Sequence, residues 1–243
     1  MRCNKHSRWS NALPTLFLSS LVSIGFFVAQ AIINHSWANS YLLINLLLAW
    51  IPLLVVYYLL RVLPYYPWLN WRPMLLTFLW LGLLPNSFYL VSDLIHLALV
   101  APNSILYDSV MFQTFIFNGL ILGYLSVYLV HRQLLRRITT HWANILLGLA
   151  FFVCSFAIYL GRELRLSSWN FVTTPASILF GISSPFVNIS GHLQAYTVTL
   201  MFFILIVLMY VVVFRLLQIF IRPSRAPLPE QRLANPVADK IRR

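Results

Sequence analysis

The sequence predicts an all-α fold, a polytopic transmembrane helical bundle of about six spans with both termini in the cytoplasm. Of its 243 residues, 60% are hydrophobic and only 9% are charged, whereas a soluble domain carries about 25% charged residues. The apolar residues are grouped in long runs, each near the roughly 20 residues that a helix needs to cross the hydrocarbon core. The basic residues stand at the ends of these runs, as they do in membrane proteins.

Composition also argues against some functions. The formal net charge is +12, but the charges stand beside apolar runs and not on a soluble basic face, so we expect no nucleic-acid partner. Cys3 and Cys154 lie far apart in the sequence. We therefore predict neither a disulfide nor a cysteine metal motif.

The chain is predicted to hold one transmembrane domain, residues 13–221, between two basic cytoplasmic tails. The tails are residues 1–12 and 222–243, and we expect the second, which is rich in Pro and Arg, to be disordered. The six predicted spans lie at residues 13–33, 41–60, 74–99, 107–130, 142–160 and 195–221.

The first span also resembles a secretory signal peptide, because it follows a basic segment and ends near Ala29-Gln30-Ala31. Its apolar run is long for a signal peptide, so we interpret it as an uncleaved anchor, with cleavage as the alternative. The second span contains Pro52, which neighbouring helices accommodate with a kink. The linker that follows, residues 61–73, is rich in Pro and aromatic residues and is typical of the lipid headgroup level.

The later spans contain three further signals. Pro85 removes one backbone hydrogen bond from the third span, so we expect a kink near residues 81–85. Asp108 falls in the first turn of the fourth span, where the helix macrodipole favours an acid. Residues 171–191 are uncharged but broken by prolines and glycines, and we predict a re-entrant or interfacial segment there.

The distribution of Lys and Arg orients the spans. All but two of the 17 Lys and Arg residues fall on one side of the six-span topology, in the tails, in the loops at 61–73 and 131–141, or at Arg215. Arg162 and Arg165 fall on the other side. The positive-inside rule therefore predicts cytoplasmic termini. We expect the protein in the plasma (inner) membrane.

Polar residues collect on one stripe of the third span, in LPNSFYLVSDLIHL (84–97). At 100° per residue, Asn86, Tyr89, Asp93 and His96 fall within an arc of about 80°. Lipid-facing positions do not tolerate such groups, so we expect the stripe to face a partner or water.

Further charged residues are predicted at the depth of this stripe, near the outer surface, and they leave two interpretations open. In the first, arginines and carboxylates form a salt-bridge network that only locks helices together. In the second, they line a pocket with catalytic residues and substrate-binding residues. The catalytic set would be Asp93, His96 and Glu163. The binding set would be Asn86, Tyr89, Asp108, Arg162, Arg165 and Trp169.

A metal ion is a third interpretation of the same residues. Asp93 and His96 are three residues apart on a helix and both able to approach one ion, with Asp108, Glu163 or His192 as a further ligand. The sequence has no spaced cluster of His or Cys, so it assigns no cofactor to the site.

Two segments resemble the signature stretches of a known family. LPNSFYLVSDLIHL (84–97), YLGRELRLSSWN (159–170) and the Asp of ILYDSV resemble those of the bacterial membrane-protein family catalogued as domain of unknown function 1361. Asn170 stands where the family has Asp, so that carboxylate is not an obligatory acid or metal ligand in this chain. The resemblance implies a multi-pass bacterial membrane protein without an established activity. The matching residues are Pro85, Asn86, Tyr89, Asp93, His96, Asp108, Gly161, Arg162, Arg165, Ser168 and Trp169.

Three functions remain open from the sequence, and whether the protein is an enzyme is open with them. The first is a protein that binds or processes an anionic or lipid-linked envelope substrate at the outer leaflet, held by Arg162 and Arg165. The second is a proton- or cation-coupled transporter in which Asp93 and Glu163 titrate. The third is a structural or assembly subunit whose charge cluster only fixes helix packing. Membrane lipids are expected partners in all three.

Overall fold

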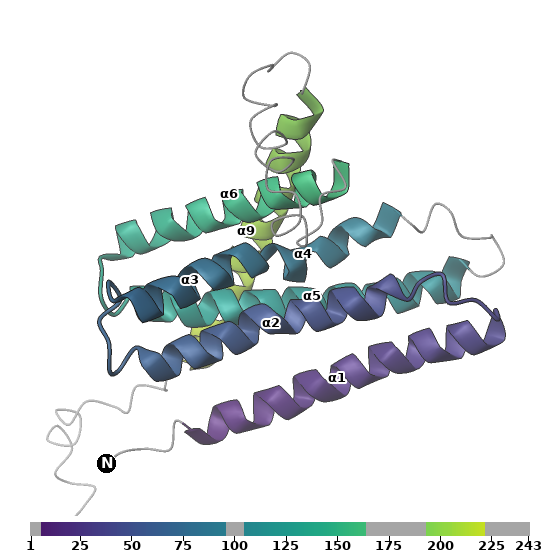
Figure 1. Cartoon of the computed structure of the whole chain (residues 1–243), viewed down its shortest axis with the longest axis horizontal. Helices are drawn as coiled ribbons and strands as arrows, with labels where there is room; N and C mark the ends of the chain where they lie inside the picture. Colours follow the sequence, from purple (N-terminus) through teal and green to yellow (C-terminus); the bar gives the residue numbers. More distant parts are fainter. Residues whose placement is uncertain (1–5, 96–104, 164–192, 222–243) are drawn as a thin grey trace, which may run out of the picture. The chain divides into compact units, whose positions relative to one another are not determined.

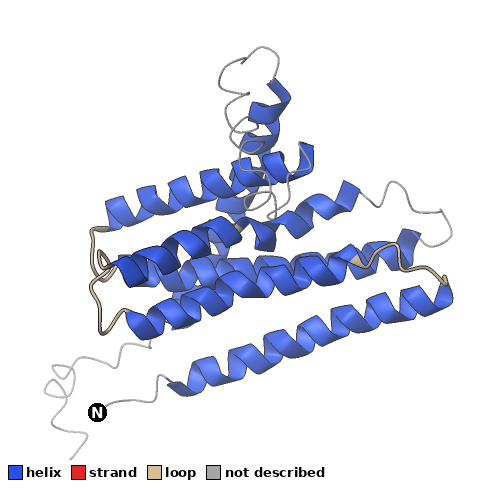
Figure 2. Ribbon diagram, in the orientation of Figure 1, coloured by secondary structure: helices blue, strands red, loops and turns tan. Residues whose placement is uncertain are grey.

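The computed structural model describes residues 6–95, 105–163 and 193–221, and within these ranges the chain is helical with no strand (Figure 2). The predicted all-α class is therefore confirmed. The helices are α1 (His6–Ile33), α2 (Tyr41–Val62), α3 (Trp71–Leu83), α4 (Pro85–Ser92), α5 (Ile105–Leu134), α6 (Thr140–Glu163) and α9 (Leu193–Ile221). The predicted re-entrant segment, residues 171–191, lies outside the described residues.

Six stretches are long and apolar enough to cross a membrane, as predicted. They are Leu13–Ile33, Tyr41–Val62, Trp71–Ile95, Ile105–Leu134, Thr140–Arg162 and Leu193–Leu216. Most of the helices run past the predicted span limits, and α5 extends to Leu134 where the fourth span was predicted to end at residue 130. A helix can continue beyond an apolar run because its backbone hydrogen bonds do not require apolar side chains, and the last turn of α5 holds His131 and Arg132.

The third span is broken where the sequence predicts a kink. α3 ends at Leu83 and α4 begins at Pro85, which has no N–H to donate to the preceding turn. The Leu84 N–H still bonds the Trp80 carbonyl at 2.8 Å, and the chain then tightens, with the Ser87 N–H 3.1 Å from the Leu84 carbonyl. α4 ends at Ser92, and residues 93–95 form a single 3₁₀ turn.

Residues 1–207 form one compact unit and residues 208–243 a second. Within the first unit α5 is the central helix (Figure 1). The share of its apolar window that is buried is 61%, against 28 to 44% for the other spans that lie wholly in this unit. Helices α1, α2 and α4 pack against α5, while α6 packs mainly against α4.

The contact between α4 and α5 depends on two glycines. A Cβ at Gly119 would lie 2.7 Å from the Ser87 carbonyl oxygen, and a Cβ at Gly123 would lie 2.9 Å from the Ser87 Cβ. Small residues allow such close approach between membrane helices. Ser87 also donates a hydrogen bond of 3.1 Å to the Ala49 carbonyl of α2, so this side chain joins α4 to α2 as well.

Candidate functional site

Asp93 lies at the end of α4 and is almost completely buried, with 1% of its surface exposed. It follows the last helical residue, and its N–H bonds the carbonyls of Leu90 and Val91. The Ser92 hydroxyl closes the same turn by donating to the Tyr89 carbonyl at 2.6 Å. The end of the broken third span therefore holds a carboxylate in the protein interior, where a charge needs a partner.

Two side chains from other helices supply that partner. Arg162, in the last turn of α6, places Nη1 3.3 Å from Oδ1 of Asp93. Asn45, in α2, donates from Nδ2 to Oδ2 at 2.9 Å. Helices α2, α4 and α6 thus meet at one carboxylate, and both of its oxygens accept hydrogen bonds.

Arg162 makes further contacts with α4. Its Nη2 donates to the Ser92 carbonyl at 2.8 Å, and its guanidinium carbon lies 5.8 Å from the centre of the Tyr89 ring. The Tyr89 hydroxyl in turn lies 3.4 Å from the Gly161 carbonyl, the acceptor of a long hydrogen bond. The side chain of Arg162 nevertheless keeps 20% of its surface exposed. We name Asp93, Arg162, Asn45 and Tyr89 the Asp93 cluster.

Asp108 and Asn86, which the sequence groups with Asp93, each hold a buried polar atom without a hydrogen-bond partner among the described residues. Asp108 lies in the first turn of α5 with 2% of its surface exposed, and among the described residues its Oδ1 has no hydrogen-bond partner. Asn86 is half-buried, and within the same part of the chain its Nδ2 has none. Of the predicted residues whose side chains are described, the structure brings together Asp93, Tyr89 and Arg162.

The other predicted site residues lie outside the described side chains. Glu163 closes α6, but its side chain is not described, and the rest fall in the segments 96–104 and 164–192. In the part of the chain that the structure describes, no three His, Cys, Asp or Glu side chains gather as metal ligands. The residues in these two segments are His96, Arg165, Trp169 and His192. The roles predicted for them and for Glu163 remain predictions.

Sequence reasoning missed two members of this neighbourhood, both on α2. Asn45 donates a hydrogen bond directly to Asp93. Tyr41 lies close enough to Asp93 and Arg162 to interact electrostatically with both. The two residues are four positions apart and therefore share a helix face. An amide within the apolar run YLLINLLLAW was the available signal, because a polar group inside a membrane span needs a partner.

Six apolar helices with an ion pair buried among them define a multi-pass α-helical membrane protein. Residues 44–211 match the model of the family described as protein of unknown function (DUF1361). That is well over half of the chain, which therefore belongs to this family. The family that the sequence resembles is therefore confirmed. No curated protein and no solved structure matches the chain.

Proposed function

We propose that this is a multi-pass protein of the bacterial inner membrane that binds an anionic or lipid-linked envelope substrate at the Asp93 cluster. Both termini are in the cytoplasm and the cluster faces the outer leaflet. The observation that carries the proposal is the unequal exposure of the ion pair: Asp93 is buried, whereas Arg162 keeps a fifth of its side chain exposed.

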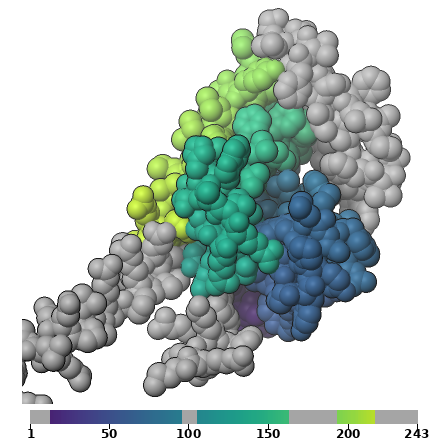
Figure 3. All heavy atoms as spheres, turned by 90° about the vertical axis from the view of Figure 1, so that its left-hand side faces the viewer, coloured from purple at the N-terminus to yellow at the C-terminus, as the bar shows by residue number. Residues whose placement is uncertain are grey.

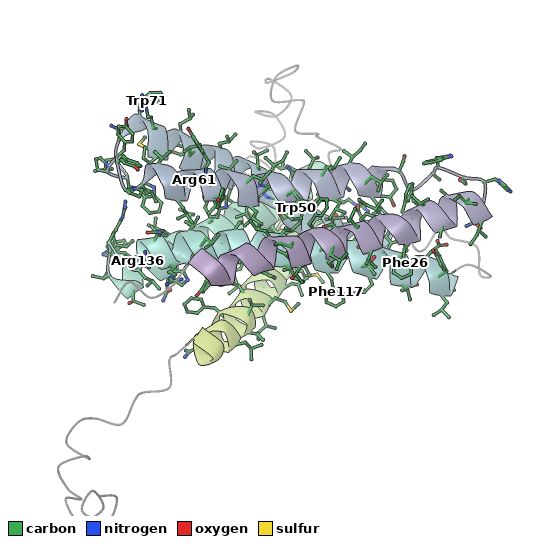
Figure 4. The ribbon with its side chains drawn as sticks, turned by 90° about the horizontal axis from the view of Figure 1, so that it is seen from below. Phe26, Trp50, Arg61, Trp71, Phe117 and Arg136 are labelled. Carbon is green, nitrogen blue, oxygen red and sulfur yellow. The ribbon has the colours of Figure 1, made fainter. Side chains whose placement is uncertain are left out.

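The arrangement of charges supports this orientation. Arg61 and Arg136 lie at the same end of the bundle, together with Trp71 (Figure 4). Asp93 and Asp108 lie at the ends of their helices away from these arginines. The arginine-rich end is cytoplasmic by the positive-inside rule, which leaves the acidic end outside.

Arg162 is suited to hold an anion without leaving Asp93. A guanidinium has five N–H donors, and the hydrogen bonds to Asp93 and Ser92 in the described chain engage its two terminal nitrogens once each. An incoming phosphate or carboxylate oxygen would take a remaining donor. Asp93 accepts hydrogen bonds on both oxygens, which suits a fixed anion better than a proton donor. We therefore assign the cluster to binding before any reaction.

The second candidate function is structural, and one observation favours it. The pair joins α6 to α4, and Asn45 adds α2, so the cluster would hold three helices in register even without a ligand. Breaking such a pair from one side is costly, about 3–5 kcal/mol, because a buried charge loses its partner. Removing both charges together is close to neutral.

This difference separates the two functions. The full chain and three variants are placed in phosphatidylcholine nanodiscs with a polyprenyl phosphate as the probe. The variants are Arg162→Gln, the double variant Asp93→Asn/Arg162→Gln, and Arg61→Gln as the control for loss of one exposed arginine. Thermal unfolding reports stability, and native mass spectrometry reports retained polyprenyl phosphate.

We expect Arg162→Gln to be unstable and the double variant to regain most of the stability. If the cluster binds the probe, the double variant should retain about tenfold less polyprenyl phosphate than the wild type, because a charge-assisted hydrogen bond is lost. The control Arg61→Gln should retain the probe. A stable double variant that retains the probe as the wild type does would reject binding and leave the structural role.

A further inference from the structure

A second polar site lies at the opposite end of the bundle from the Asp93 cluster. A groove of about 560 Å³ opens there, lined by residues 63–69 and Arg137. This volume is within the usual range for small-molecule sites. The groove is formed where the turn between α2 and α3 lies beside the turn between α5 and α6, shown in blue and teal in Figure 3. We name it the Arg137 groove.

The guanidinium of Arg137 is held in the wall of this groove. One of its terminal nitrogens, Nη2, donates to the Leu63 carbonyl at 3.3 Å, and its central carbon lies 5.4 Å from the centre of the Trp68 ring. Trp68 is itself fixed, since its indole N–H donates to the Thr77 hydroxyl at 3.0 Å. Arg137 therefore presents an oriented charge with donors left for a ligand.

Among the described residues that form this end of the first unit, no carboxylate balances the arginines. The sequence has no Asp or Glu before Asp93 and none between residues 109 and 162. The two turns that form the groove and the helix ends beside them nevertheless contain five arginines. Two of these stack on tyrosine rings, Arg61 on Tyr57 at 4.6 Å and Arg72 on Tyr66 at 4.8 Å. The groove therefore lies in a positive field, which attracts anions. The five are Arg61, Arg72, Arg132, Arg136 and Arg137.

The surroundings of the groove are apolar as well as basic. On its rim, Tyr65 is 82% exposed and Leu69 is 90% exposed. α3 begins directly after the groove-lining turn and exposes Leu75 and Phe78 along its side. A ligand with a phosphate head and acyl chains would place its head against Arg137 and its chains along such a face.

We propose that the Arg137 groove binds the headgroup of an anionic phospholipid in the leaflet on the arginine-rich side. Basic pockets between membrane helices on the cytoplasmic side are known to take such headgroups. The proposal concerns a different ligand position from the Asp93 cluster and does not depend on it. Arg137 is the principal cation, and the Trp68 ring holds the guanidinium in place.

Phosphatidylglycerol is the probe that tests this site. The full chain is placed in nanodiscs of phosphatidylcholine alone or of equal parts phosphatidylcholine and phosphatidylglycerol, and native mass spectrometry measures the phosphatidylglycerol retained. Arg136→Gln is the matched control, because it removes an adjacent exposed charge that does not line the groove. We expect this control to lose about fivefold in affinity, as any arginine near the surface does, and Arg137→Gln to lose about tenfold more.

A second pair of variants guards against misfolding of Arg137→Gln. Leu69 lines the groove but is almost fully exposed, so Leu69→Glu and Leu69→Gln leave the fold intact. The carboxylate repels a phosphate, so Leu69→Glu should bind phosphatidylglycerol more weakly than Leu69→Gln. The double variant Asp93→Asn/Arg162→Gln should retain phosphatidylglycerol in the groove.

Three results would overturn the proposal. The first is an Arg137→Gln affinity no lower than that of Arg136→Gln, which would describe a diffuse charged surface. The second is equal affinity in the two Leu69 variants. The third is displacement of phosphatidylglycerol by glycerol phosphate at equal concentration, which would make the groove a site for a free phosphate compound and not for a lipid.

Discussion

The side-chain amide of Asn45 donates a hydrogen bond of 2.9 Å to Oδ2 of Asp93, which lies 48 residues further along the chain. The bond joins the beginning of the second membrane span to the end of the third. It also means that the carboxylate of Asp93 does not depend on Arg162 alone. The Asp93 cluster is therefore part of the contact between α2 and α4.

Asn45→Ala should destabilise the protein by about 1–3 kcal/mol, because a buried charged acceptor loses a donor. Unfolding in detergent micelles measures the change. Leu47→Ala is the control, since Leu47 lies on the same helix and is 67% exposed. We expect its effect to stay within about 0.5 kcal/mol. Equal losses in the two variants would contradict a specific role for the amide.

Gly119→Ala should cost about 1–3 kcal/mol, because the added methyl group meets the Ser87 carbonyl, which cannot move without shifting α4. Gly148→Ala is the control in α6, where an added Cβ has nothing within 4 Å. That variant should gain about 0.5–1 kcal/mol from the better helix propensity of Ala. The same unfolding measurement compares them, and a neutral Gly119→Ala would show that α4 and α5 are further apart than described.

Ser87→Ala should cost about 0.6 kcal/mol and at most about 1.7, the range for side-chain hydrogen bonds between membrane helices. The bond that it removes runs to the Ala49 carbonyl near Pro52. Ser109→Ala serves as the comparison, because within the described chain the hydroxyl of the half-buried Ser109 bonds the Ile105 carbonyl of its own helix. A larger loss in Ser109→Ala than in Ser87→Ala would disagree with the described contact.

Cysteine labelling tests the orientation. With Cys3 and Cys154 replaced by serine, single cysteines are introduced at Trp37 and at Tyr65, which are 67% and 82% exposed in turns at opposite ends of α2. A membrane-impermeant maleimide on intact cells should label Trp37→Cys, whereas Tyr65→Cys should react only after permeabilisation. The reverse pattern would invert the topology and move the Asp93 cluster to the cytoplasmic side.

Much of the fold follows from local properties of the chain. Six apolar runs of sufficient length predict six membrane helices, because helices satisfy their own backbone hydrogen bonds in lipid. Pro85 predicts the break between α3 and α4, because a missing N–H is a property of one residue. The limits of the helices were less predictable, since hydropathy marks the hydrocarbon core and not the last backbone hydrogen bond.

The candidate site was predictable in part. The polar stripe of the third span and the arginine at the end of the fifth pointed to Asp93, Tyr89 and Arg162, because charges at membrane depth need partners. Asn45 was not predicted as a site residue, because a single amide in an apolar run does not indicate which residue it will bond. The grouping of Asp108 with Asp93 rests on their predicted depth in the membrane and stays a prediction.

By itself, the sequence determined that this protein crosses the membrane, about where each helix does so, and which residues are too polar to face lipid. These follow from free energies of transfer and backbone hydrogen bonding, which belong to single segments. Only the tertiary structure decided that α2 supplies a donor to Asp93, that α5 is the central helix, and that Arg137 meets Trp68 in one groove. Such contacts depend on how the helices rotate and approach one another. A small residue such as Gly119 allows a short distance between two helices, but the sequence does not say which helix will pack against it.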